Sequence, residues 1–133
     1  MTGKFWLDKK YNNVKISKHF NLREFACHGT GQVIIYTPLI KRLERLRKRL
    51  KRSIIVNSGF RTQYWNKRIG GSKKSTHKRG EGADVRSPGV TIKRLAVECK
   101  AVGFRCIIAH EKEGFVHVDE RKSIFWVVPR GWF

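Results

Sequence analysis

Four leucines recur along one stretch of the chain at the spacing of a single helical face. They are Leu39, Leu43, Leu46 and Leu50. Separations of four, three and four residues place them on one side of an α-helix, and Pro38 is well tolerated in a first turn. The other positions carry mainly Lys and Arg, so the sequence predicts a core helix over Pro38–Lys51 with a strongly basic outer face.

Short apolar runs elsewhere predict strands, and a second amphipathic helix is expected over Thr91–Val102. The expected strands are Ile54–Asn57, Ala83–Arg86, Cys106–Ala109, Phe115–Val118 and Ser123–Val128, the last ones in hairpin-like pairs. Short helices are expected at Asn21–Cys27 and Gln63–Arg68, the first with a capping-box pattern. This mixture predicts a small α+β domain, in which two longer helices pack on a mostly antiparallel sheet with one open face.

The chain has 133 residues and shows no repeat, low-complexity tract or linker, which predicts a single domain over 1–133. Residues 1–16 are expected to form a basic N-terminal arm, and residues 129–133 a C-terminal tail. No apolar run approaches the roughly 18–20 residues of a membrane span. No signal peptide is visible, so we expect synthesis in the cytoplasm followed by release. We expect a monomer.

The charge of the chain restricts its partners. Thirty Lys and Arg residues against ten Asp and Glu give a formal net charge of +20. Such a chain is attracted to polyanions. Nucleic acid, an anionic membrane surface and the acidic polymers of a bacterial cell wall all satisfy this requirement, and charge alone does not choose among them.

Acidic residues and histidines are few, and most of them fall in one part of the chain. Seven of the ten acids lie between residues 81 and 120, near three of the five histidines. His77 lies in a loop, Asp84 begins a strand seven residues later, and His117 lies in the alternating run Phe115–Asp119. Two imidazoles and a carboxylate are a standard ligand set for catalytic zinc. From spacing alone, each could equally be a structural residue.

Several ordered motifs resemble the peptidase M15 family. The segment from Ser75 to Asp84 is similar to the family's S-x-H-x-x-G-x-A-x-D signature, although Gly82 stands where the family has Ala. Other segments follow in the same order: His19–Phe25 resembles H-F-x-L-x-E-F, Val56–Arg61 resembles V-x-S-G-[YF]-R, and Phe115–Asp119 resembles F-[IV]-H-[VI]-D. The resemblance therefore spans most of the chain.

The resemblance implies a zinc-dependent peptidase that cuts peptidoglycan stem peptides at the bacterial cell wall, of the D-alanyl-D-alanine carboxypeptidase or endopeptidase type. Such enzymes serve wall metabolism and phage lysis. Carried over by position, His77, Asp84 and His117 would bind Zn²⁺. Arg61 would face the substrate and stabilise an oxyanion, and Ser75 would hydrogen-bond the substrate peptide.

The general base departs from the family pattern. Many relatives place an acid three residues before the last zinc histidine, whereas this chain has Gly114, which carries no side chain to move a proton. Glu113 and His110 are the nearby substitutes, together with Glu111. Asp119 is expected to orient a zinc ligand or Arg61.

Two other classes of function stay open. One is a wall-binding relative that keeps the fold without catalysis, which the Gly114 position favours. The other is a nucleic-acid-binding domain, favoured by the charge and by aromatics interleaved with cations, but without a helix-turn-helix, zinc-finger or RNP pattern. A Cys–His peptidase is disfavoured, because Cys27 and His28 are adjacent and do not face each other on a helix.

Overall fold

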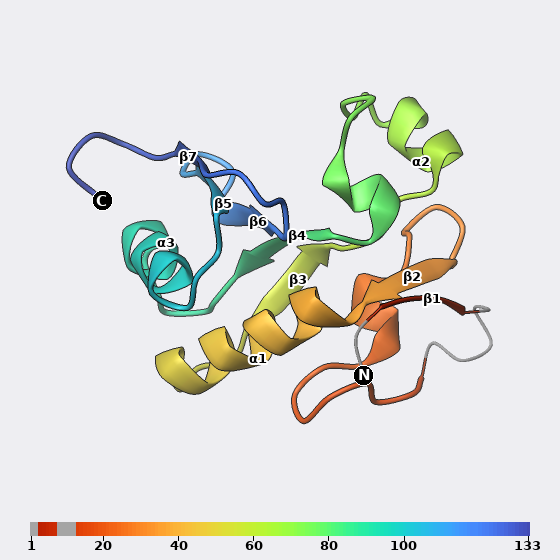
Figure 1. The fold of residues 1–133 in the computed structure, drawn as a ribbon, viewed down its shortest axis with the longest axis horizontal. Helices are drawn as coiled ribbons and strands as arrows, with labels where there is room; N and C mark the ends of the chain where they lie inside the picture. Colours follow the sequence, from red (N-terminus) through yellow and green to blue (C-terminus); the bar gives the residue numbers. More distant parts are fainter. Residues whose placement is uncertain (1–2, 8–12) are drawn as a thin grey trace.

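A five-stranded sheet forms the centre of the protein (Figure 1). The computed structural model describes residues 3–7 and 13–133. In spatial order the strands are β3 (Ile55–Ser58), β4 (Gly82–Arg86), β6 (Phe115–Asp119), β5 (Cys106–His110) and β7 (Phe125–Val127). Each neighbouring pair is antiparallel except β5 and β7. The predicted α+β class and mostly antiparallel sheet are confirmed.

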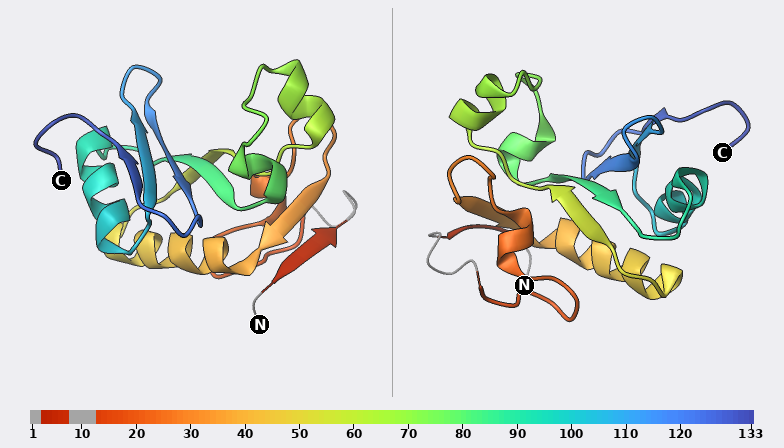
Figure 2. Two further views of the ribbon diagram at one scale, coloured as in Figure 1. Left: turned by 45° about the horizontal axis from the view of Figure 1, so that its top comes forward. Right: turned by 180° about the vertical axis from the view of Figure 1, so that it is seen from behind.

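The two long helices pack beside each other against the sheet, as predicted. They are α1 (Thr37–Leu50) and α3 (Ile92–Ala101). The leucine stripe of α1 is buried, and α3 begins after Thr91, whose hydroxyl accepts the N–H of Arg94 at 3.1 Å. Figure 2 shows α1 and the short helix α2 (Gln63–Arg68) on opposite sides of the sheet. Among the described residues, no helix has the length and apolarity needed to cross a membrane.

The N-terminal part contains a strand pair that the sequence analysis did not anticipate. Strand β1 (Lys4–Leu7) pairs antiparallel with β2 (Val33–Tyr36), which leads directly into α1. Four-residue strands are too short to show a clear period of two. The first belongs to the expected N-terminal arm, of which residues 1–2 and 8–12 lie outside the described part of the chain.

Two further details differ from the sequence-based expectation. The segment around Asn21 forms the 3-10 helix η2 (Leu22–Phe25) rather than a longer turn of helix, although the Glu24 carboxylate accepts the Asn21 N–H at 2.6 Å as a capping box requires. The last strand, β7, pairs in parallel with β5 and forms no hairpin with β6. The loop after β6 carries the chain across to the far side of β5, and a tight turn between neighbouring antiparallel strands cannot do this.

The register of β4 and β6 separates the core from the opposite surface of the sheet. Ala83 lies opposite Val118 and Val85 opposite Val116, and all four are fully buried in the core. The alternate positions of the two strands carry the polar side chains. Asp84 lies across from His117, and Asp119 lies across from Gly82. Because successive residues of a strand point to opposite faces, the polar side chains gather on the side away from the core.

Candidate metal centre

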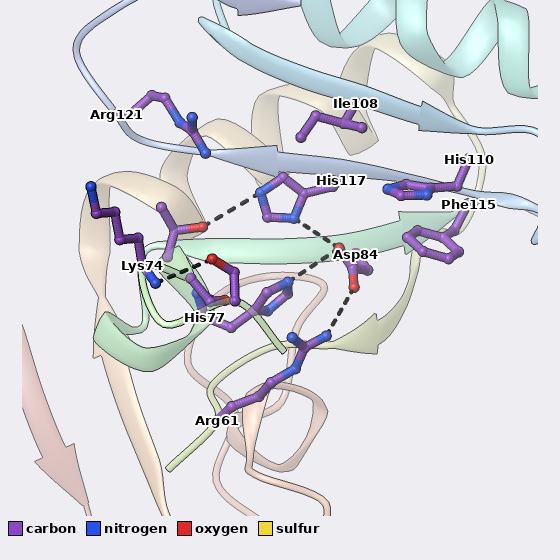
Figure 3. Close-up of a pocket in the computed structure, with 12 residues that line it drawn as sticks. Arg61, Lys74, His77, Asp84, Ile108, His110, Phe115, His117 and Arg121 are labelled. Carbon is purple, nitrogen blue, oxygen red and sulfur yellow. Dashed lines mark hydrogen bonds and ion pairs between the residues drawn. The ribbon is translucent and has the colours of Figure 1, made fainter. Parts of the chain in front are cut away.

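Three polar side chains from separate elements meet at the polar face of the sheet (Figure 3). His77 comes from the 3-10 helix η3 (Thr76–Arg79), Asp84 from β4 and His117 from β6. Asp84 Oδ1 lies 2.8 Å from His117 Nδ1 and 3.2 Å from His77 Nε2. All three residues are buried, and their candidate ligand atoms lie within 4.8 Å of one another.

The outer nitrogen of each imidazole is already bonded to an acceptor. His77 Nδ1 lies 2.6 Å from the carbonyl oxygen of Gly59, and His117 Nε2 lies 2.8 Å from Asp119 Oδ2. These oxygens only accept, so each outer nitrogen carries a hydrogen, and each inner nitrogen faces Asp84, to which it either donates a proton or, once deprotonated, presents a lone pair for a metal. Two imidazole nitrogens and a carboxylate thus face one point, and a cation or protons must lie between them.

The pKa values of the site residues also show that positive charge is stabilised beside Asp84. Burial disfavours a charged imidazole, yet hydrogen bonds to Asp119 and Asp84 outweigh it and raise the pKa of His117 to about 11. Burial also opposes ionisation of Asp84, but the hydrogen bonds with His117 and His77 hold its pKa well below the usual range. Each group is therefore held in its charged form by its neighbours.

The donor set fits Zn²⁺. Two imidazole nitrogens and one carboxylate are typical protein ligands of a catalytic zinc, which keeps a fourth position for water or substrate. Both imidazoles are oriented by hydrogen bonds from their outer nitrogens, as metal-binding histidines generally are. A cleft of about 470 Å³ opens directly beside these side chains.

Asp119 lies beneath His117 and is fully buried. Besides His117 it binds Arg121, whose Nη2 lies 2.8 Å from Asp119 Oδ2, and it accepts the Thr76 hydroxyl at 3.1 Å. Burial opposes ionisation of Asp119, but His117 and Arg121 hold its pKa well below the usual range. The structure thus pairs Asp119 with His117 and Arg121, while Arg61 lies against Asp84 instead.

Thr76 and Arg121 are site residues that the sequence analysis missed. Thr76 occupies an unspecified position of the signature, so the motif gave no reason to select it. Arg121 follows Asp119 by two residues, and only this spacing could have suggested a contact. Thr76 also accounts for Gly82, because a Cβ at position 82 would lie 2.4 Å from the Thr76 hydroxyl oxygen.

The two predicted substrate residues line the cleft. Arg61 follows β3, and its guanidinium lies 3.5 Å from Asp84 Oδ2 and 3.4 Å from Asn66 Oδ1. The oxygen of Asp84 that meets Arg61 is not the one that meets the histidines. Ser75 caps η3, where its hydroxyl accepts the His77 N–H at 3.2 Å, and it can still donate its hydrogen to a ligand.

The two substitutes for the missing acid lie in different surroundings. His110 lines the cleft and stacks on Phe115 with ring centroids 4.4 Å apart. Glu113 is exposed on the turn between β5 and β6 and is not among the residues that line the cleft. Gly114 has a φ of 80°, a left-handed conformation in which an acidic side chain would be strained.

None of the three cysteines lines the cleft. All three are free and buried. Cys106 lies close enough to His117 and Asp119 to form a second possible metal-binding group. However, burial raises the pKa of the Cys106 thiol, which opposes the thiolate that zinc requires. The His77–Asp84–His117 group, whose donors face the cleft, is the better metal centre.

Comparison with known families fits this geometry. A sequence profile described as Peptidase M15 matches residues 18–119, which include all three candidate ligands. The chain belongs to the peptidase M15 family. M15 peptidases are zinc-dependent metallopeptidases. The two histidines and the aspartate found here are compatible with a zinc site. A comparison with curated proteins gave no significant match.

Proposed function

We propose that this M15 family member is a zinc peptidase that hydrolyses the stem peptides of peptidoglycan, as a D-alanyl-D-alanine carboxypeptidase or an endopeptidase. The observation that carries the proposal is the convergence of two imidazole nitrogens and the Asp84 carboxylate at the wall of a cleft. When bound by His77, Asp84 and His117, Zn²⁺ supplies a Lewis acid that polarises a carbonyl and activates water.

The cations of the cleft suit a peptide substrate that carries carboxylates. Arg61, Lys74 and Arg121 line it. The Arg61 guanidinium, held by Asp84 and Asn66, binds the oxygen that gains negative charge during amide hydrolysis. A guanidinium suits this role because its fixed fork of donors is always charged. Ser75 donates its hydroxyl hydrogen to the substrate backbone.

We assign the proton transfers to His110. In the β5–β6 pair, Ile108 lies opposite His117 and His110 opposite Phe115, so His110 is the diagonal neighbour of His117 on the same face. Diagonal neighbours on a strand pair are about 7–8 Å apart. At this separation one water can connect the His110 imidazole to the centre formed by His117 and Asp84. His110 accepts the proton of the attacking water and returns it to the departing amine. Glu113 is too exposed for this role.

The proposed place of action is the bacterial cell wall, reached after synthesis in the cytoplasm and release, with the chain acting as a monomer. A net charge of +20 would hold it near anionic wall polymers or membrane lipids. This attraction would weaken as salt screens exposed charges.

Purified peptidoglycan provides the test. The zinc-loaded protein is expected to release free alanine as a carboxypeptidase, or to create new amino groups as an endopeptidase. The His77→Ala variant is expected to lose zinc and activity, whereas His28→Ala, which changes an exposed histidine outside the cleft, keeps both. Tight zinc binding without any product would favour the non-catalytic wall-binding relative. DNA binding that ignores chelators, with no zinc bound, would favour the nucleic-acid class.

The role of His110 is tested separately. His110→Gln is expected to lower kcat by about 10²–10⁴-fold and to leave zinc stoichiometry unchanged. Glu113→Gln, which changes an exposed residue on the turn between β5 and β6, is expected to leave kcat unchanged. A large loss in Glu113→Gln with normal His110→Gln activity would overturn the assignment.

A further inference from the structure

Exposed apolar side chains gather at the C-terminal edge of the sheet. Among the described residues, large hydrophobic side chains are exposed at nine positions, and four of these are consecutive. They are Ile124 (62% exposed), Phe125 (46%), Trp126 (37%) and Val127 (48%). Because successive strand residues point to opposite faces, both faces of β7 are left exposed. Single exposed apolar residues are ordinary, but a continuous group marks an interaction surface.

Side chains from α3 and the C-terminal tail extend this surface. Lys100 Nζ lies 4.9 Å from the ring centroids of both Trp126 and Phe133. Val97, three residues before Lys100 and therefore on the same side of α3, is also exposed. We call the surface formed by Val97, Lys100, Ile124–Val127 and Phe133 the aromatic edge.

The charges around the aromatic edge are all of one sign along the adjoining segment. Residues 121–133 include Arg121, Lys122 and Arg130 and no acidic residue. The Arg121 guanidinium lies 5.0 Å from the Phe125 ring centroid, and Arg105 binds the carbonyl oxygen of Lys122 at 2.7 Å. Glu98, the one acidic residue of α3, is paired with Arg49. Apolar and aromatic groups are thus bordered by cations.

We propose that the aromatic edge binds the surface of an anionic lipid bilayer. Aromatic rings and aliphatic side chains enter the boundary between headgroups and acyl chains, while Lys and Arg extend to the headgroup phosphates. Each cation near an anionic surface strengthens the attraction. Arg121 borders both this edge and the candidate metal cleft, so binding places the cleft beside the membrane.

Two other occupants fit the surface less well. Single-stranded nucleic acid stacks its bases on aromatic faces, but Ile124, Val127 and Val97 offer no such face and partition into hydrocarbon instead. A second copy of this chain would bring two charges of +20 together. It would also have only the three-residue strand β7 along which to pair.

Vesicle binding tests the proposal independently of peptidase activity. The full chain, with zinc and with chelator, is sedimented with vesicles of phosphatidylcholine alone or with phosphatidylglycerol, at about 0.3 M NaCl to screen the general charge. We expect binding to the anionic vesicles in both conditions. The Ile124→Ser/Phe125→Ser variant is expected to bind at least about tenfold more weakly. The matched control, Tyr64→Ser/Ile69→Ser, removes side chains of similar exposure from the α2 region and is expected to bind normally.

Fluorescence quenching by brominated lipids reports insertion directly. Trp126→Phe is expected to lose a substantial part of the quenching, whereas Trp6→Phe, which changes an exposed tryptophan on β1, is expected to keep it. Equal binding by the two serine variants, or quenching unaffected by Trp126→Phe, would overturn the proposal. The proposal would also be overturned if Ile124→Ser/Phe125→Ser kept vesicle binding but lost an affinity for a single-stranded oligonucleotide that the unchanged protein has. The same holds if the variant kept vesicle binding but lost a concentration-dependent dimer of the unchanged protein.

Discussion

The two faces of the β4–β6 strand pair are both buried, but their burial has opposite energetic consequences. On one face, Ala83, Val85, Val116 and Val118 lie in the core with leucines of α1 and α3. On the other, Asp84, His117 and Asp119 are between 0% and 8% exposed. Burying the first set stabilises the fold. Burying the second costs free energy that mutual hydrogen bonds and charge pairing must offset.

This difference shows how one strand pair can carry both the core and a reactive site. On the apolar face, stability depends on close packing, so a substitution that removes side-chain volume is destabilising. The polar face needs complementary charge, so its residues depend on a cation and on one another. Substitutions should therefore separate stability from metal binding according to the face that they change.

The largest effect is expected from Asp84→Asn, which keeps the shape of the side chain but removes the charge shared by both histidines. Loss of a residue that only hydrogen-bonds a metal ligand lowers metal affinity by up to about 100-fold. Because Asp84 is itself a candidate ligand, zinc affinity should fall by more than this. Competition with a chromophoric chelator measures this. Zinc binding as tight as in the unchanged protein would show that the donors do not share an ion.

Val118→Ala makes the reciprocal change on the apolar face. Because Val118 is fully buried, its truncation should lower the free energy of unfolding by about 2–3 kcal/mol. Zinc affinity should stay within about threefold, since metal ligands lie on the other face. Urea denaturation with an unchanged m-value checks the first part. A loss of zinc affinity larger than the loss of stability explains would contradict the separation of the two faces.

Asp119→Asn is expected to have a smaller effect on the polar face than Asp84→Asn. The amide oxygen can still accept the His117 Nε2 hydrogen, but without the charge that orients it, so zinc affinity should fall about 10–100-fold. Glu120→Gln is the matched control, because the Glu120 carboxylate is paired with Arg42 outside the site. Equal effects of the two changes would mean that Asp119 has no special role in holding His117.

The smallest effect is the change in zinc affinity over a single pH unit, which is about tenfold for the release of one proton. The pKa of His117 is raised to about 11 in the cation-free protein, so its imidazole is protonated at neutral pH. Zinc needs the unprotonated Nδ1, and binding should release about one proton and tighten as pH rises toward that pKa. Calorimetry in buffers of different ionisation enthalpy counts the proton. Zinc binding to His117 without proton release near pH 7 would contradict the raised pKa.

The elements that were predictable share a local signal. The leucines of α1 repeat at helical spacing, and the alternation from Phe115 to Asp119 is visible without knowing what packs on it. The sequence motifs also identified His77, Asp84 and His117 as candidate metal ligands, and the fold places these three residues together. Whether they hold zinc stays a prediction that the titrations above address.

Other features depend on contacts between distant segments and left no local trace. The β1–β2 pair joins Phe5 to Ile35, and β7 crosses to the outer edge of β5. The contacts of Asp119 with Thr76 and Arg121 are of the same kind. No period or spacing in the chain encodes which of these segments meet.

The sequence alone determined which residues carry charge and lone pairs, and which faces of the helices and strands are apolar, because side-chain direction follows from local backbone geometry. Only the tertiary structure decided that His110 lines the cleft while Glu113 points to solvent, and that Asp119 supports His117. These outcomes depend on strand register and on the paths of loops. Both are set by packing across the whole domain rather than by neighbours along the chain.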